Sequence, residues 1–259
     1  MKSIGLIGCG NLGSLIAQGV QKHLSDRYIM AFFLDSDGQA AERLAGRCGG
    51  RVCQTLPELL AHNPDCIVEA ATADTLKEIA EPCLRAGCDV VALSAGALAD
   101  EAFAARAEAA ARRSGKKLHI ASGALGGFDL MNAARLSGAL SCRIVNLKSP
   151  QALGLEDAPQ EERLIFSGNA RDAIAAFPKN VNVAAAAAFA SCGMQDTTVE
   201  VRCRPGLALN THRVELEGDF GHAVIEVASR PSADNPRSSA LAADSVVACL
   251  QNLDAGIVF

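Results

Sequence analysis

Short apolar runs and amphipathic stretches alternate along the first half of the chain. The runs predict β-strands at residues 3–7, 28–34, 51–53, 66–70, 89–93 and 117–120. Between them, apolar residues recur every three or four positions and predict helices at 14–24, 39–47, 56–60, 75–86 and 100–113. This alternation is typical of βαβ units. Residues 1–121 are therefore predicted to form an α/β domain with a doubly wound parallel sheet.

A different pattern begins after residue 121. A turn of small residues at 122–127 leads into a helix that ends near residue 136. Strands are predicted at 141–148, 164–167, 197–203, 210–217 and 223–229, with helices at 169–176 and 181–190 and a loop at 155–162. A hairpin turn at 217–221 joins the last two strands, and Ser238 is expected to cap a final helix that ends near Leu250. Residues 122–234 are thus predicted to form an α+β domain with a mainly antiparallel sheet.

The composition indicates which kinds of molecule the protein is not expected to bind. The 259 residues are 49% hydrophobic and 4% aromatic, with no Trp and a net charge of −5. These values indicate a folded protein and argue against binding to nucleic acid or to an anionic membrane. No apolar run reaches the roughly 18 residues that a membrane span needs, and the N-terminus reads as a strand, not a signal peptide. The chain is predicted to be cytoplasmic.

The ten cysteines do not follow a metal-binding or redox pattern. The sequence contains no Cys-x-x-Cys and no histidine at zinc-finger spacing from a cysteine. In a cytoplasmic chain we expect free thiols that pack as small apolar groups, with no disulfide and no metal ligands. Cys9 stands apart because it lies inside a glycine motif, but packing is the favoured interpretation there too.

The glycine motif is the strongest chemical signal in the sequence. Gly8, Gly10 and Gly13 follow the first strand as Gly-x-Gly-x-x-Gly and open a helix, which is the context of a dinucleotide-binding Rossmann turn. Gly8 allows the tight turn, Gly10 lets the backbone approach the pyrophosphate, and Gly13 lets helix and strand pack closely. The N–H groups of Asn11 and Leu12 at the helix start can then donate to the pyrophosphate.

The residue that ends the second strand suggests which dinucleotide binds. Asp35 can accept hydrogen bonds from the adenosine ribose hydroxyls and would repel a 2′-phosphate. NAD is therefore the expected cofactor, while Arg43 and Arg47 downstream keep NADP possible. Ala71 and Ser94 follow the fourth and fifth strands at the carboxyl edge of the sheet, where small residues leave room for the dinucleotide or simply pack.

His212 differs from the other four histidines. It shares its strand parity with Val214 and Leu216, so it is predicted to point inward with the apolar face. An inward histidine is more often a core residue than a catalyst. Asn182, at the start of an Ala-rich helix, belongs to a polar segment whose ordinary role is capping.

Six segments, in order over nearly the whole chain, resemble the L-aspartate dehydrogenase family. They are Gly8–Gly13, Ser94–Leu98, Ser122–Asp129, Phe177–Ala184, Asn210–Gly221 and Asn235–Ser239. The resemblance implies a second domain that carries the substrate site and a homodimer interface, and a segment 235–259 that returns to the first domain. It also implies that His212 is catalytic, that Ala124 and Asn182 contact the cofactor, and that the product supplies NAD biosynthesis, although the same enzyme could equally serve aspartate breakdown.

Such an enzyme moves a hydride from Cα of L-aspartate to the nicotinamide and leaves iminosuccinate, which water hydrolyses to oxaloacetate and ammonia. The amine must first lose a proton, because an ammonium group has no lone pair with which to form the C=N bond. His212 is the candidate to accept that proton or to activate the water, and the sequence leaves both roles open. Arg143, Lys148 and Lys179 are the candidate partners of the two substrate carboxylates.

Two alternatives share the first domain. A two-domain oxidoreductase of the homoserine dehydrogenase or dihydrodipicolinate reductase type would differ in the second domain. A non-enzymatic NAD-binding sensor would keep the glycine motif and would need no inward histidine.

Overall fold

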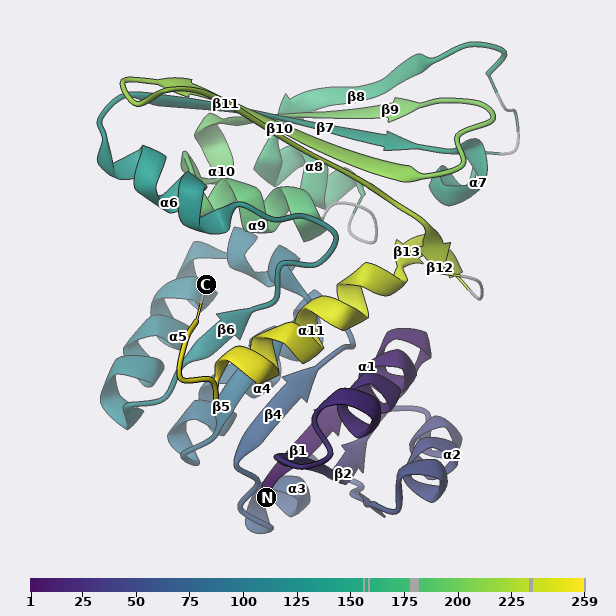
Figure 1. Ribbon diagram of the computed structural model, residues 1–259, viewed down its shortest axis with the longest axis vertical. Helices are drawn as coiled ribbons and strands as arrows, with labels where there is room; N and C mark the ends of the chain where they lie inside the picture. Colours follow the sequence, from purple (N-terminus) through teal and green to yellow (C-terminus); the bar gives the residue numbers. More distant parts are fainter. Residues whose placement is uncertain (156, 158, 178–181, 233–234, 259) are drawn as a thin grey trace. The chain divides into compact units, whose positions relative to one another are not determined.

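The chain divides into two compact units. The computed structural model describes residues 1–155, 157, 159–177, 182–232 and 235–258. One unit comprises Met1–Ala121 and the C-terminal segment from Ala242 onward, and the other comprises Ser122–Leu241 (Figure 1). The predicted return of the chain at residue 235 is thus placed too early. Residues 235–239 pair as a strand with Pro231–Ser232, and this pairing keeps them in the second unit.

Six parallel strands form the sheet of the first unit. They are β1 (Lys2–Ile7), β2 (Tyr28–Leu34), β3 (Arg51–Val52), β4 (Cys66–Glu69), β5 (Asp89–Ala92) and β6 (Leu118–Ile120). Their order is β3-β2-β1-β4-β5-β6, so the chain reverses direction across the sheet between β1 and β4. In such a sheet, ligands bind outside the carboxyl ends of the strands at this switch point. The predicted Rossmann arrangement is confirmed.

Helices flank this sheet. They are α1 (Asn11–His23), α2 (Gly38–Cys48), α3 (Leu56–Ala61), α4 (Ala73–Arg85), a short 3₁₀ helix (Ala95–Ala99), α5 (Glu101–Ser114) and α11 (Ala240–Asn252). The core on one face joins β1, β2 and β4 to α1, α2 and α11 through buried residues such as Ile16, Phe33 and Leu250. The Tyr28 hydroxyl donates to the Leu250 carbonyl at 3.0 Å and ties the last helix to the start of β2.

Local sequence sets most helix ends in this unit. Asp37, Thr55, Thr72 and Asp100 accept hydrogen bonds from N–H groups in the first turns of α2, α3, α4 and α5. Helix α1 is different, since its N-cap is Gly10, no side chain caps it, and its first turn has no acidic residue. It also begins at Asn11, earlier than the predicted residue 14, so that Gly13 lies inside its first turn.

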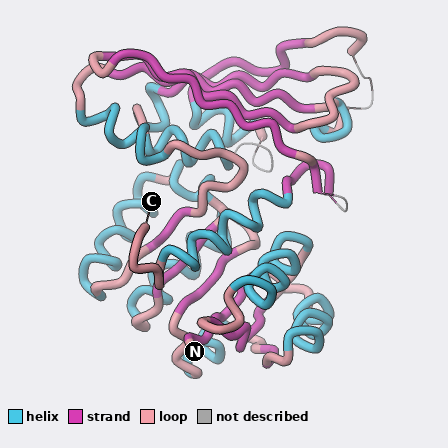
Figure 2. The backbone as a smooth tube through the Cα atoms, viewed as in Figure 1, coloured by secondary structure: helices cyan, strands magenta, loops and turns pink. Residues whose placement is uncertain are grey.

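The second unit is an α+β domain, as predicted. Its sheet has the order β11-β10-β7-β9-β8. The strands are β7 (Leu140–Lys148), β8 (Arg163–Asn169), β9 (Thr197–Cys203), β10 (Asn210–Gly218) and β11 (Gly221–Ser229). Every pairing is antiparallel except that of β7 with β9. Figures 1 and 2 show one sheet face covered by α6 (Phe128–Leu136), α8 (Ala170–Ala176), α9 (Asn182–Ala190) and α10 (Gly193–Asp196).

Five short elements were absent from the sequence prediction, among them the 3₁₀ helix and α10 already described. Helix α7 (Pro150–Leu153) follows β7, and strands β12 (Pro231–Ser232) and β13 (Asn235–Ser239) form a small ladder before α11. Because the strand runs to residue 239, the cap of α11 is Ser239 and not Ser238. The Ser239 hydroxyl accepts from the Leu241 N–H at 3.2 Å. Within the part of the chain that the structure describes, no helix has the length and apolar character to cross a membrane.

Candidate active site

The glycine motif forms a tight turn between β1 and α1. Gly8 has φ +97°, and a Cβ there would stand 2.6 Å from the backbone of Ala70 on the neighbouring strand. A Cβ on Gly13 would collide with the carbonyl oxygen of Gly8. Gly10 is exposed, and a Cβ there would meet no protein atom within 4 Å. The fold therefore requires Gly8 and Gly13, while the open space at Gly10 fits a dinucleotide pyrophosphate that needs close backbone approach.

This difference between the glycines is testable. We expect Gly10→Val to abolish NADH binding without lowering the melting temperature, because the added side chain enters only space that a pyrophosphate would use. Fluorescence titration with NADH and a thermal melt measure both effects. Gly46→Val is the matched control, since Gly46 is also exposed and also has no atom within 4 Å of a built Cβ. Retained NADH binding in Gly10→Val would rule out this placement of the cofactor.

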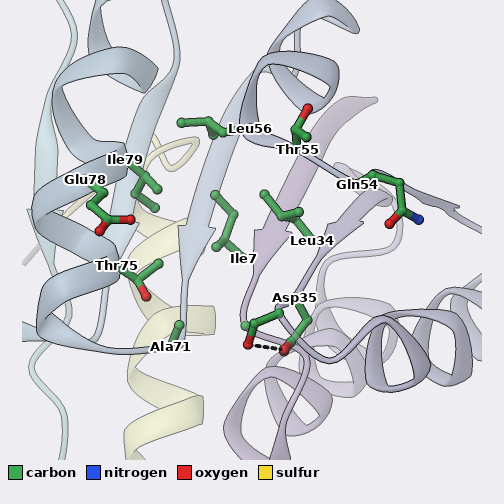
Figure 3. A pocket seen from close by; sticks show the side chains of 12 residues that line it. Ile7, Leu34, Asp35, Gln54, Thr55, Leu56, Ala71, Thr75, Glu78 and Ile79 are labelled. Atoms are coloured by element: carbon green, nitrogen blue, oxygen red, sulfur yellow. Dashed lines mark hydrogen bonds between the residues drawn. The ribbon is translucent and has the colours of Figure 1, made fainter.

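Asp35 lies beside the glycine turn. Its Oδ2 accepts from the Cys9 N–H at 2.5 Å and its Oδ1 from the Asp37 N–H at 2.8 Å, so the carboxylate is held in place from both sides. It opens onto a pocket of about 310 Å³ within the first unit (Figure 3). The lining residues are Ile7, Gly8, Leu34, Asp35, Ser36, Gln54, Thr55, Leu56, Ala71, Thr75, Glu78 and Ile79. This pocket, with the carboxylates of Asp35 and Glu78 and an apolar wall, suits an adenosine.

Glu69 is a functional candidate that the sequence prediction missed. It ends β4 with 0% exposure, among residues that read as an apolar run. Its carboxylate accepts from the Ala71 N–H at 2.8 Å, the Ser94 N–H at 3.1 Å and the Ser94 hydroxyl at 2.7 Å. Burial raises its pKa, and these hydrogen bonds limit the rise. Glu69 thus ties together the carboxyl ends of β4 and β5, where the two predicted cofactor residues lie.

In the second unit, the residues on the buried face of the sheet are apolar at one end of the strands and polar at the other. The inward residues Cys142 and Ile144 on β7 and Val214 and Leu216 on β10 are apolar. Toward the other end of the same face, the inward residues are Asn146, Lys148, Asn210 and His212, all at most 3% exposed. Burying polar groups is unfavourable unless they have partners, so such a cluster at one end of a core indicates a binding or catalytic site.

His212 is paired across the sheet with Asn146. The two residues lie opposite each other in the β7–β10 register, and His212 Nδ1 is 2.6 Å from Asn146 Oδ1. Because an amide oxygen only accepts, Nδ1 donates and Nε2 keeps its lone pair. Burial, together with the charge of Lys148, lowers the pKa of His212 to about 3. The imidazole is therefore neutral at physiological pH and presents Nε2 as a base.

Two donors near His212 lack partners. Asn146 Nδ2 is buried and has no hydrogen-bond partner among the described residues. Lys148, two residues further along the same face, is 3% exposed, and burial lowers its pKa to about 8. No carboxylate of the described residues forms an ion pair with it. A buried ammonium and a buried amide without acceptors favour an anionic ligand at this end of the sheet.

The other two cationic candidates do not join this cluster. Arg143 has the opposite parity on β7 and forms ion pairs with Glu200 at 2.7 Å and Glu215 at 2.9 Å. Its proposed role in substrate binding is therefore wrong, because the outer face of the sheet already supplies its carboxylates. Lys179 lies outside the described residues.

The two remaining predicted cofactor residues also belong to the second unit. Ala124 is buried in the turn before α6, and Asn182 is the first residue of α9. A Cβ on Gly123 would stand 3.8 Å from Val183 Cγ2, so this turn lies against the start of α9. Their contact with a cofactor stays a prediction.

Seven of the ten cysteines are buried and three are partly buried. All ten are free thiols. Burial raises the pKa of Cys9 to about 12, which keeps its thiol protonated and unreactive at neutral pH. Nothing about Cys9 therefore favours a redox role over packing.

Comparison with known proteins assigns the two halves of the chain. Residues 8–121 match the family described as "Homoserine dehydrogenase, NAD binding domain", and residues 129–253 match "Aspartate dehydrogenase, C-terminal". An L-aspartate dehydrogenase from Methanospirillum hungatei is 38% identical over 100% of this chain and 99% of its own length. The chain belongs to the L-aspartate dehydrogenase family. An L-aspartate dehydrogenase 2 from Bordetella bronchiseptica is also 38% identical, over 96% of this chain and 95% of its own.

Membership of the L-aspartate dehydrogenase family agrees with the observed architecture. The crystal structure of an aspartate dehydrogenase from Thermotoga maritima has the same fold, with a TM-score of 0.79 at 23% identity over 100% of this chain and 99% of that one. The first half matches a family that is named for the NAD-binding domain of homoserine dehydrogenases. The second half, which contains the His212 cluster, is the part that matches the aspartate dehydrogenase C-terminal family.

Proposed function

We propose that this protein is an NAD-dependent L-aspartate dehydrogenase that oxidises L-aspartate to iminosuccinate, which water converts to oxaloacetate and ammonia. The observation that carries the proposal is the buried cluster of His212, Asn146 and Lys148 in the second unit. It combines a neutral base with two donors that have no partner among the described residues, and an acidic amino acid needs such groups to be deprotonated and bound. The nicotinamide, when bound, supplies the hydride acceptor.

His212 is the proton acceptor in this proposal. Asn146 orients the ring through Nδ1, so that the lone pair of Nε2 is the one available to the substrate. An amine proton or a proton of the hydrolytic water can be taken there, and both roles use the same tautomer. The carboxylates of a bound substrate would offset the charge of Lys148 and raise the pKa of His212 from its low value, which makes it a stronger base once the substrate is present.

Lys148 and Asn146 are proposed to bind a substrate carboxylate. A charge-assisted hydrogen bond from the ammonium and a second one from Asn146 Nδ2 would give both groups the partner that they lack among the described residues. L-homoserine carries a hydroxyl in place of the side-chain carboxylate and so would leave part of this cluster unpaired. The cluster therefore favours L-aspartate over the homoserine dehydrogenase alternative. A non-enzymatic NAD-binding sensor has no need of the His212–Asn146 pair.

One assay separates these functions. Formation of NADH is followed by absorbance with L-aspartate, L-homoserine and a panel of other amino acids as substrates. We expect turnover with L-aspartate and little with the uncharged amino acids. Turnover with L-homoserine alone would support the alternative enzyme class, and NADH binding with no turnover on any amino acid would support a sensor.

Asp35 is proposed to set the preference for NAD over NADP. Its carboxylate faces the pocket that suits the adenosine, and Arg43, which could have bound a 2′-phosphate, lies 3.7 Å from Asp37 instead. We expect Asp35→Ala and Asp35→Asn to shift the ratio of kcat/KM for NAD and NADP toward NADP by at least about tenfold, since both remove a like charge. An unchanged ratio in both variants would mean that Asp35 does not contact the ribose.

Three further proposals follow from the family. The free state of all ten thiols supports a reducing compartment, and we place the enzyme in the cytoplasm. We also propose that it is a homodimer, which light scattering after size-exclusion chromatography tests.

Iminosuccinate is a reactive imine, and we propose that it feeds NAD biosynthesis. Accumulation of labelled NAD from labelled aspartate, lost on deletion of the gene, tests that role.

A further inference from the structure

Three side chains of different chemistry meet beside α3. Cys53 follows β3, and its N–H donates to the Phe33 carbonyl at 2.8 Å. Glu58 lies in α3, and His62 follows it four residues later at the helix end, so the two share one side of the helix. A thiol sulfur, a carboxylate oxygen and an imidazole nitrogen thus lie within 4.8 Å of one another.

We propose that Cys53, Glu58 and His62 form a Zn²⁺ site with an open fourth position. Sulfur and imidazole ligands favour a borderline-soft cation, whereas Mg²⁺ and Ca²⁺ prefer sets made of oxygen alone. Three protein ligands and one water complete a tetrahedral zinc site. Ligand atoms in such a site lie closer together than 4.8 Å, and rotation of the Glu58 side chain, which is only half-buried, brings Oε1 closer to the other two ligand atoms.

The surroundings of the cluster orient its ligands. Glu58 Oε2 accepts from the Gln54 N–H at 2.8 Å, which leaves Oε1 for a metal. The His62 ring stacks on Phe32 with centroids 4.8 Å apart and an interplanar angle of 5°, which restrains the imidazole. Such outer contacts are the usual support of metal ligands. Arg51 Nη2 lies 3.7 Å from Oε1, but its side chain is 62% exposed, and an exposed pair of this kind is weak enough for a metal to displace.

The cluster adjoins the wall of the cofactor pocket. Gln54, Thr55 and Leu56, which line the pocket in Figure 3, lie between Cys53 and Glu58 in the sequence. A metal bound to Cys53, Glu58 and His62 would link both ends of this segment. The site therefore braces the wall of the pocket, and it is separate from the His212 cluster, which lies in the other unit.

Cobalt titration tests the proposal without using enzyme activity. The full-length protein is stripped with chelator, desalted and titrated with Co²⁺ under reducing conditions. We expect a near-ultraviolet thiolate-to-cobalt charge-transfer band and visible bands of tetrahedral cobalt, saturating at one equivalent and lost on addition of Zn²⁺. Zn²⁺ alone should raise the melting temperature, because it binds the folded state.

Single variants assign the ligands. Cys53→Ser should abolish the charge-transfer band, and Glu58→Gln and His62→Gln should each weaken Co²⁺ binding by at least about tenfold. Cys48→Ser, which removes a half-buried thiol of the same unit, should leave the spectrum unchanged. Melting of each variant without metal checks its folding. Absence of the bands in the unmodified protein, or a spectrum in Cys53→Ser or His62→Gln like that of the unmodified protein, would overturn the site and leave the proposed activity untouched.

Discussion

Replacing His212 with alanine is expected to lower turnover of L-aspartate by about a hundredfold or more, the usual scale of general acid–base catalysis. The variant should still fold and bind NADH, because the glycine turn and the Asp35 pocket belong to the first unit. Turnover, the dissociation constant for NADH and the melting temperature are measured on one preparation of the variant.

A matched control is available for this experiment. His222 lies at the exposed start of β11, and His222→Ala should leave turnover unchanged. If His212 were only a core residue, His212→Ala would lower the melting temperature while the folded fraction kept normal turnover. A stable variant that binds NADH and turns over L-aspartate at a near-normal rate would remove His212 from the mechanism.

Replacing Lys148 with methionine should have opposite effects on stability and on activity. The buried ammonium has its pKa lowered to about 8, from 10.5, by burial alone. That shift corresponds to a destabilisation of about 3 kcal/mol at neutral pH, which a methionine of similar size would relieve. The free energy of unfolding should therefore rise. The KM for L-aspartate should also rise, by about tenfold to a hundredfold, through loss of a charge-assisted hydrogen bond.

The stability gain of Lys148→Met should depend on pH. Below pH 8 the lysine is protonated in both the folded and the unfolded states, so the full destabilisation is present. Between pH 8 and 10.5 the unfolded state holds the proton more tightly, so the unmodified protein gains stability as the pH rises. The difference between variant and unmodified protein should accordingly shrink over this range. Denaturant melts at pH 7 and pH 10 measure it.

A surface lysine provides the comparison for Lys148. Lys117→Met removes an exposed ammonium from the first unit and should change neither the stability nor the KM by much. If Lys148→Met lowered stability and left the KM for L-aspartate unchanged, Lys148 would have a structural role and the carboxylate would bind elsewhere.

Much of the first unit could be predicted from the sequence because its determinants are local. Apolar runs and helical periodicity are properties of adjacent residues, and they located the six strands of the parallel sheet. The turn itself gives Gly8 its positive φ and places the Gly8 carbonyl against Gly13. Strand parity likewise placed His212 on the buried face, since successive residues of a strand point to opposite sides.

Pairings between distant segments were decided only by the tertiary structure. In the sequence, Glu69 reads as part of an apolar strand. In the structure, Ser94, which follows β5, donates two hydrogen bonds to the Glu69 carboxylate. Arg143 and Lys148 were equal candidates in the sequence. The sheet pairs Arg143 with Glu200 and Glu215 on one face, whereas Lys148 on the other face has no ion-pair partner among the described residues.

Two further features could not be predicted from the sequence for the same reason. They are the cap of α11 and the grouping of Cys53, Glu58 and His62. The sequence prediction placed the helix cap at Ser238, whereas pairing of β13 with β12 extends the strand to Ser239 and gives Ser239 that role. The grouping of Cys53, Glu58 and His62 matches no familiar ligand spacing, and it arises from the way a strand end meets a short helix. Periodicity and motifs therefore determined the elements and the cofactor class. Contacts between residues far apart in the chain decided which charged side chains are paired with an opposite charge and which remain available to bind a substrate.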